Sequence, residues 1–125
     1  MANVDVIVGV EPYFLLSESK PDEGRFVYAY TVTIKNNGQS HAKLLTRHWV
    51  ITNGETMATT EVRGDGVIGE QPTIQPGEEY VYTSGTIMES AVGTMQGSYR
   101  MIDAEGEYFD ISIPVFTLAA TNSLH

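Results

Sequence analysis

The most suggestive chemical motif is a run of glycines in the middle of the chain. Gly64, Gly66 and Gly69 form a literal G-x-G-x-x-G, a pattern that in dinucleotide-binding proteins allows a tight strand-to-helix turn and brings main-chain N–H groups to a pyrophosphate. The helix that this mechanism needs is not predicted, because Pro72 and Pro76 follow within seven residues of Gly69. We therefore expect a glycine-rich connection, with nucleotide or pyrophosphate binding as the alternative hypothesis.

A second cluster is Arg47-His48-Trp49. If this segment is a strand, its side chains alternate between two faces, so His48 points away from Arg47 and Trp49. Leu45, Trp49 and Ile51 make the odd-numbered face apolar, which would place Arg47 in or beside the core, paired with a carboxylate. With the glycines, this cluster gives the candidate patch for a ligand or partner: Gly64, Gly66, Gly69, Arg47, His48 and Trp49.

Residues suited to catalysis or to a transition metal are absent or badly spaced. The chain has no cysteine, and His41, His48 and His125 form neither an H-x-H nor an H-x-x-x-H pair. No G-x-S-x-G elbow is present to expose a nucleophilic serine. We therefore predict that the protein is not an enzyme, and that it has no catalytic residue, no metal centre and no cofactor.

Three acids could still attract a hard cation. Asp103, Glu105 and Glu107 surround Gly106, and carboxylate oxygens suit Mg²⁺ or Ca²⁺. Their spacing departs from that of the EF-hand loop, so solvated charges on a hairpin are the first interpretation. Direct Mg²⁺ or Co²⁺ binding by acids of the second half is left as a weaker alternative.

The charge of the chain is negative and unevenly distributed. Residues 1–63 hold seven acids and six bases, a net of -1, whereas residues 64–125 hold nine acids and one base, a net of -8, which together give the formal charge of -9. A protein that binds the phosphate backbone needs the opposite sign. The composition thus argues against nucleic acid and anionic membranes as direct partners, and favours a cationic partner surface or a loosely held divalent ion.

The elements that position these residues are predicted to be strands. Alternation of apolar and polar residues predicts strands over 4–10, 25–36, 43–52, 56–63, 79–84, 95–102 and 107–117. In 25–36 the even-numbered residues should face the core. Only residues 86–92 suggest a helical turn. The fold class is therefore all-β: an antiparallel β-sandwich of the immunoglobulin or fibronectin type III kind with about seven strands.

Turn chemistry supports this assignment. Asn53-Gly54 predicts a two-residue type I′ hairpin, and Pro76-Gly77 suits the two central positions of a type II turn. Pro114 lies inside the last strand. Because proline cannot donate to a sheet, that strand should lie at an edge or carry a bulge.

Length and the terminal segments indicate one cytoplasmic domain. The length of 125 residues suits a single domain spanning 1–125. Residues 1–8 contain no lysine or arginine, which is wrong for a secretory signal. The longest charge-free run, 111–125, is too short and too polar to span a membrane as a helix.

These segments, in this order, resemble the bacterial ApaG family. The matching stretches are RFVYAYTVTIKN (25–36), LLTRHWVIT (44–52), GDGVIGEQP (64–72), PGE (76–78), YTSG (82–85), GTMQGSY (93–99) and IPVF (113–116). The turn after Thr52 is a local departure, because family members often have a longer acidic and glycine-containing connection. The resemblance implies a fibronectin type III-like sandwich.

The functional implications of the resemblance are less specific. The family is associated with cobalt and magnesium homeostasis under an efflux-related label, and with genes that handle diadenosine tetraphosphate. Related domains in eukaryotic F-box proteins and in a polymerase-interacting protein look like protein-binding modules. Without a membrane segment, any part in efflux must be indirect. We therefore expect a non-enzymatic domain that binds an unidentified protein partner, with strand addition or homodimerisation at an exposed strand edge as possible modes.

Overall fold

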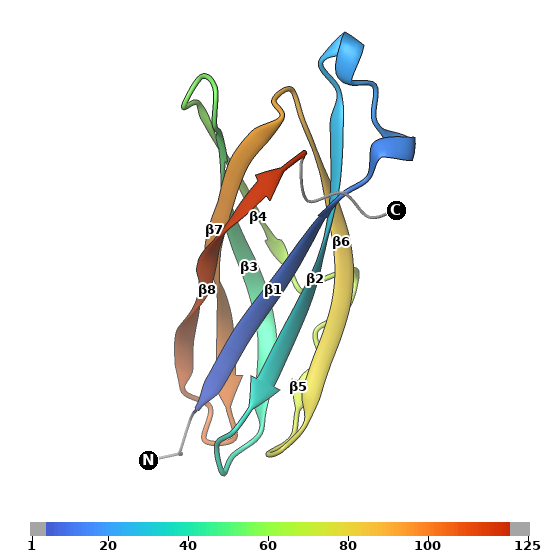
Figure 1. Cartoon of the computed structure of the whole chain (residues 1–125). Coiled ribbons are helices and arrows are strands. Elements are labelled where there is room, and N and C mark those ends of the chain that lie inside the picture. Colours follow the sequence, from blue (N-terminus) through green and yellow to red (C-terminus); the bar gives the residue numbers. More distant parts are fainter. Residues whose placement is uncertain (1–4, 121–125) are drawn as a thin grey trace.

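The computed structural model describes residues 5–120, which form two antiparallel β-sheets packed face to face (Figure 1). The smaller sheet has the order β1 (Val6–Phe14), β2 (Phe26–Asn36), β6 (Glu79–Met88). The larger has the order β4 (Thr59–Asp65), β3 (Ala42–Asn53), β7 (Val92–Asp103), β8 (Tyr108–Ala119), and the two-residue β5 (Thr73–Ile74) pairs with β3. Single 3₁₀ turns at Leu16–Glu18 and Pro21–Glu23 join β1 to β2. The predicted β-sandwich is confirmed, and β5 brings the strands to eight.

The core lies between the sheets and follows the predicted alternation. In β2 the side chains of Tyr28, Tyr30, Val32 and Ile34 are buried, as expected for its even-numbered face. Trp49 of β3 is only 3% exposed. Its indole makes edge contacts with three core rings from both sheets, those of Tyr30, Tyr99 and Phe116. Trp49 is therefore the large residue that joins the two layers.

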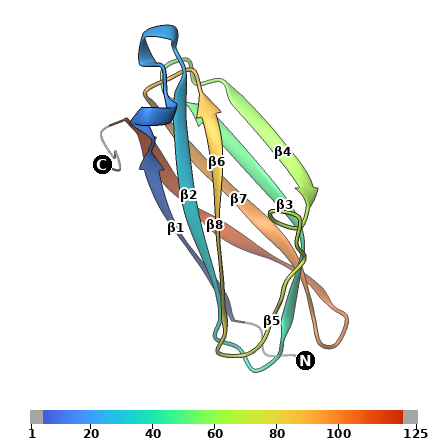
Figure 2. The ribbon, with the colours of Figure 1, turned by 90° about the vertical axis from the view of Figure 1, so that its right-hand side faces the viewer.

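The two sides of the sandwich differ. On one side β1 and β8 pack beside each other, so the edge of the larger sheet at β8 is partly covered (Figure 1). On the other side β4 and β6 are both edge strands, since β4 pairs only with β3 and β6 only with β2. Figure 2 looks onto this side and shows the connection after β4 passing between the two sheets. Two strand edges without a hydrogen-bonded neighbour therefore lie on this side of the described fold.

A bulge in β3 sets which residues face the core. Leu44 pairs with Met101 but Thr46 pairs with Arg100, so Leu45 is an extra residue on β3. Before the bulge the even-numbered Leu44 is buried. After it the odd-numbered residues turn inward, as the sequence pattern predicted. The carbonyl of Leu45 accepts hydrogen bonds from Gly66 and Gln71, which lie outside the sheet.

One predicted turn is confirmed and one is wrong. At Pro76-Gly77, Gly77 has φ +83° and the N–H of Glu78 donates to the Gln75 carbonyl, as a type II turn requires. At Asn53-Gly54 the two-residue type I′ hairpin was wrong: the loop spans residues 54–57, and its left-handed residue is Met57.

The reason for the longer loop lies in Asn53 and Gly54. The side-chain carbonyl of Asn53 accepts the N–H groups of Glu55 and Thr56, so Asn53 starts the loop instead of occupying a central turn position. The N–H of Gly54 donates to the Val92 carbonyl at 2.9 Å. A Cβ at Gly54 would lie 2.7 Å from that oxygen. Gly54 is therefore needed for a close approach, not for a positive φ.

The last strands give two further results. The helical turn predicted at 86–92 is wrong, because β6 continues to Met88, which pairs with Phe26 of β2. The expectation for Pro114 is confirmed in both respects. β8 is the edge strand of the larger sheet, and its pairing shifts from Gly97 with Ile113 to Met95 with Phe116, which places one extra residue beside Pro114.

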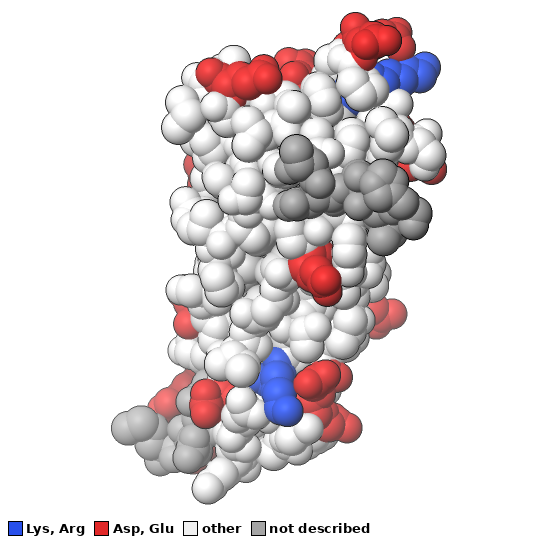
Figure 3. Space-filling model, in the orientation of Figure 1, with Lys and Arg blue, Asp and Glu red and all other residues white. Residues whose placement is uncertain are grey.

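The face of the molecule that β1, β2 and β8 form is acidic mainly toward its two ends. Figure 3 shows a largely uncharged middle on the face formed by β1, β2 and β8, with acidic side chains gathered toward both ends. Within residues 5–120 no helix is long and apolar enough to cross a membrane.

Candidate functional site

The glycine motif forms a tight loop that is held by the β3 bulge. Gly66 and Gly69 have φ angles of +63° and +80°, and Ile68 between them has φ +43°. Val67 and Glu70 exchange two main-chain hydrogen bonds of 2.8 Å, so Ile68 and Gly69 are the centre of a type I′ turn. The N–H of Gly66 and the side-chain amide of Gln71 both donate to the Leu45 carbonyl. The loop is thereby fixed to β3, with the side chain of Ile68 exposed at its tip.

This geometry differs from that of a dinucleotide-binding loop. In the part of the chain that the structure describes, the loop leads into the extended β5 and no helix follows it. The N–H groups of Gly66, Val67 and Glu70 already donate to main-chain carbonyls. A helix dipole and a ring of free N–H donors, which would hold a pyrophosphate, are therefore not what this loop offers.

Arg47 lies beside the loop and is held by it. Its Nη1 donates to the carbonyls of Asp65 and Gly66 at 2.9 and 3.0 Å. Gly64 of β4, which pairs with Arg47, leaves room for the guanidinium, since a Cβ at Gly64 would lie 2.8 Å from both terminal nitrogens. The prediction that Arg47 pairs with a carboxylate is wrong for residues 5–120, where its hydrogen bonds go to these two carbonyls. Arg47 is a fixed positive charge whose Nη2 is left without a protein hydrogen bond there.

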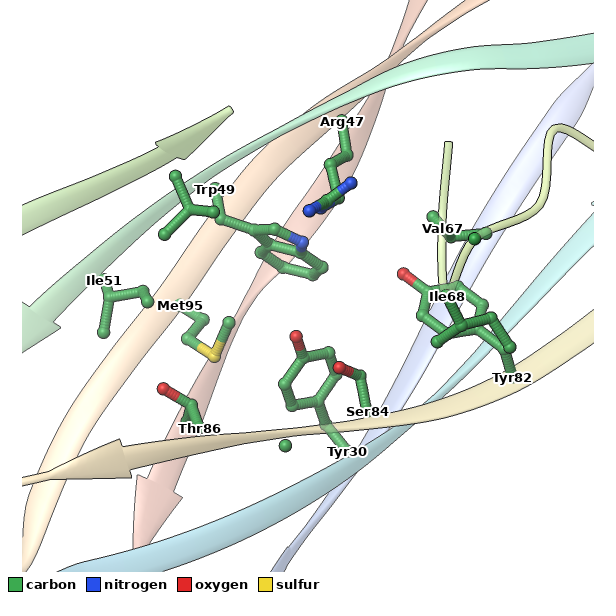
Figure 4. Close-up of a pocket in the computed structure, with 13 residues that line it drawn as sticks. Tyr30, Arg47, Trp49, Ile51, Val67, Ile68, Tyr82, Ser84, Thr86 and Met95 are labelled. Carbon is green, nitrogen blue, oxygen red and sulfur yellow. The ribbon is translucent and has the colours of Figure 1, made fainter. Parts of the chain in front are cut away.

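Arg47 and Trp49 line a hollow between the sheets. Figure 4 shows both side chains projecting from β3 toward Tyr30 and Ser84 of the smaller sheet. The hollow has a volume of about 340 Å³ and is bounded at one end by Ile68 and Gly69 of the glycine loop. Its walls are mixed aromatic, aliphatic and hydroxyl groups: Tyr30, Arg47, Trp49, Ile51, Val62, Val67, Ile68, Gly69, Tyr82, Ser84, Gly85, Thr86 and Met95.

A second hollow of about 540 Å³ continues it along the same opening. The two share Ile51 of β3 and Thr86 of β6. The second is lined by Ile51, Asn53, Thr56, Ala58, Thr60, Thr86, Ile87, Met88 and Glu89. We call the two hollows together the sheet-edge groove, because they follow the edges of β4 and β6. Alternation placed Trp49 and Ile51 in one wall, but the β6 wall could not be assigned from sequence, because it depends on which strands the topology leaves unpaired.

A tyrosine pair, one member of which lines the groove, joins the two sheets. The hydroxyl groups of Tyr82 on β6 and Tyr99 on β7 are hydrogen-bonded to each other and buried. Burial, which disfavours the phenolate, raises the pKa of Tyr82 to about 12, although its bond to Tyr99 opposes this. Burial likewise raises the pKa of Tyr99 well above its ordinary value. Both hydroxyls are therefore neutral at physiological pH and act structurally.

His48 is separated from the rest of the predicted patch. It faces the outer side of β3, where its Nε2 lies 2.7 Å from Oε1 of Glu61. This hydrogen bond, with the Coulomb attraction to His48, lowers the pKa of the Glu61 carboxyl. The structure thus brings Arg47, Trp49 and the glycine motif together at the sheet-edge groove, and places His48 on the opposite face, as the alternation predicted.

The acids of the second half meet at the turn between β7 and β8. Ligand atoms of Asp103, Glu105 and Glu107 lie within 4.8 Å of one another. Oδ1 of Asp103 accepts the N–H groups of Glu105 and Glu107 at 2.8 and 3.0 Å, and Gly106 has φ +79°. These bonds shape the hairpin turn. Asp103 is therefore buried and structural, which differs from the solvated charge that the sequence favoured, whereas Glu105 and Glu107 are exposed as expected.

Comparison with known proteins places the chain in a family. The family model described as the ApaG domain matches residues 16–103. The chain belongs to the ApaG family. Proteins named ApaG from Pectobacterium carotovorum and Pseudomonas paraeruginosa are 51% and 52% identical to it over 120 residues, which is 96% of this chain and 95% and 94% of theirs.

Solved structures agree with the ApaG assignment. A crystal structure described as the putative ApaA protein from Bordetella pertussis is 42% identical, has a TM-score of 0.91, and covers 94% of this chain and 95% of its own. Another solved structure, a structural genomics target named SoR45, is also 42% identical, with a TM-score of 0.88 over 96% of this chain and 90% of its own. The ApaG domain match includes every residue that lines the sheet-edge groove.

Proposed function

We propose that this ApaG protein is a non-enzymatic protein-interaction domain whose docking surface is the sheet-edge groove with the glycine loop. The observation that carries the proposal is the open groove between two strands that each lack a neighbour on that side. Unpaired strand edges offer main-chain donors and acceptors to another chain. Apolar side chains lie exposed along this opening, including Val62, Ile68 and Ile87, and such groups favour association because contact removes them from water.

The docking edge differs from the one that the sequence suggested. Pro114 indicated β8 as the exposed edge strand, but β1 packs beside β8 and partly covers that edge. The edges of β4 and β6 face each other across the groove and are the better surface. A second copy of the chain is one partner that could use them.

The proposed link to cobalt and magnesium homeostasis is indirect. Binding a partner would let the domain influence cation tolerance without carrying ions itself. The link is supported only by the family resemblance, so the direct test must measure both partner binding and tolerance in the same strains.

Site-specific photocrosslinking in cells provides that test. A photoreactive amino acid replaces Ile68 at the groove, and in a control it replaces Val115 on β8; these side chains are 58% and 60% exposed. We expect covalent adducts with a discrete protein at Ile68 and few at Val115. Growth in Co²⁺ and in limiting Mg²⁺ is compared for cells that carry the wild type or Ile68→Asp. No adduct at either position, with unchanged tolerance, would refute the proposal.

A second candidate, an anionic small ligand, is favoured by one observation. Arg47 presents a guanidinium beside the glycine loop with no carboxylate bound to it in the described structure. Nucleotide or pyrophosphate would approach this charge instead of a helix N-terminus. Calorimetry with diadenosine tetraphosphate and NAD decides this, and heat that disappears in Arg47→Gln would favour the ligand over a protein partner.

A further inference from the structure

The charges of the sheet-edge groove are few and lie toward opposite ends. Among the described residues that line it, Arg47 and Glu89 are the only charged ones. Arg47 belongs to the hollow next to the glycine loop, and Glu89 to the hollow next to the turn between β6 and β7. Ile51 and Thr86, shared by both hollows, lie between them. The groove therefore has a positive charge toward one end, a negative charge toward the other and an uncharged centre.

The length of the groove is also defined. At one end Ile68 and Gly69 of the glycine loop form the wall. Near the other end, the hydrogen bond from Gly54 to Val92 ties the β3–β4 loop to the start of β7. Ser84, in the wall of the Arg47 hollow, and Glu89, the first residue after β6, are five positions apart, which at the rise of an extended strand is roughly 16 Å. This length suits a short extended peptide.

Arg47 is positioned to bind an anion. Both of its protein hydrogen bonds leave from Nη1 and go to neutral carbonyls, so its position is fixed while its charge is not neutralised by a bound carboxylate in residues 5–120. A guanidinium held in this way forms strong, oriented hydrogen bonds with a carboxylate. The neighbouring indole of Trp49 and the aliphatic Ile51 offer contacts for an apolar side chain.

We propose that the sheet-edge groove binds one short extended segment of a partner protein, added as a strand along the free edge of β6. An acidic side chain of the segment meets Arg47, and a basic side chain four or six positions away meets Glu89. Even spacing is required because alternate residues of a strand share a face. Small or β-branched uncharged residues fill the positions between them. This inference rests on the proposed interaction function and specifies the chemistry of the partner.

A displayed library of random decapeptides, selected against the purified full-length protein, tests the proposal. We expect enriched peptides to contain an acid and a base four or six positions apart. Binding of fluorescently labelled enriched peptides should weaken roughly ten- to a hundredfold in Arg47→Gln, as for loss of a charge-assisted hydrogen bond. Ile68→Asp, which changes only an exposed loop tip, should also weaken binding. Val115→Asp, equally exposed but on β8, should not.

A charge reversal gives the sharpest result. Glu89 is exposed, so Glu89→Lys should fold normally, and selection against this variant should enrich peptides with two acids in place of an acid and a base. Thermal unfolding of each variant distinguishes lost binding from lost fold. If no peptide is enriched, or if the enriched peptides bind wild type, Arg47→Gln and Glu89→Lys equally well, the inference is wrong. Crosslinks at Ile68 would then still support a protein partner, one that docks through a folded surface.

Discussion

The buried pair of Tyr82 and Tyr99 provides a quantitative test of how the two sheets are joined. Tyr99→Phe removes one hydroxyl and leaves that of Tyr82 in a site only 5% exposed. A buried polar group that loses its partner costs about 1–3 kcal/mol, whereas removing both partners can be nearly neutral. We therefore expect Tyr99→Phe and Tyr82→Phe each to destabilise the protein, and the double variant to cost less than their sum.

Chemical denaturation measures this coupling through a double-mutant cycle. For a chain of this length 1 kcal/mol corresponds to a change in Tm of roughly 4 °C, so each single variant should melt roughly 4–12 °C lower. The coupling free energy should be at least about 1 kcal/mol. Tyr108→Phe, at a position 65% exposed, is the matched control and should change little. Purely additive effects would show that the hydroxyl pair does not join the sheets.

Alkaline unfolding provides an independent measurement on the same pair. The pKa of Tyr82 is raised to about 12 in the folded protein from an ordinary 10.0, so the unfolded chain loses its proton first as pH rises. The stability associated with the neutral Tyr82 is fully present below pH 10 and is lost between pH 10 and 12, by up to about 3 kcal/mol for two pKa units. The double variant should lose less stability over this range. An identical pH dependence in the wild type and the double variant would contradict the reasoning.

Three other variants test local features. Gly97→Ala should lower stability by more than about 3 kcal/mol, because its Cβ would lie 2.0 Å from the His48 carbonyl oxygen; a wild-type melting temperature would show that β3 and β7 can move apart. His48→Ala should raise the pKa of Glu61 toward its ordinary value, since the hydrogen bond between them lowers it; a carbon-detected NMR titration that finds no change would exclude this cause. Gly66→Ala should weaken the glycine loop, because a Cβ there would meet the Glu70 carbonyl at 2.2 Å and its φ is +63°; unchanged hydrogen exchange at the N–H of Val67 would refute it.

Local chemistry in the sequence was enough to predict most of the fold. Alternation in 26–36 identified the buried face of β2, because successive side chains of a strand point to opposite faces of the sheet. Pro76-Gly77 specified its turn through fixed φ angles. The Asn53-Gly54 hairpin failed because tertiary contacts decided it: Gly54 approaches Val92, which is distant in sequence. The same applies to residues 86–88, which pair with the start of β2.

The candidate site was predictable only in part. Arg47, Trp49 and the glycine motif could be identified from residue type and spacing, and alternation correctly separated His48. The partners of Arg47 could not be predicted, because every residue has a main-chain carbonyl and the sequence does not show which of them a side chain will reach. The opposite wall on β6 depends on which strand edges stay unpaired, and that is decided by the topology of the whole sandwich.

The packing of β1 beside β8 on one side of the sandwich has a practical consequence for how the protein can be attached to other molecules. β1 is the first strand of the fold and β8 is the last, and both lie on the side opposite the groove. The start of β1 and the end of β8, the points at which a tag or surface anchor would be joined to the described fold, therefore lie away from β4 and β6. A molecule immobilised through either of these two points should present the groove to solution.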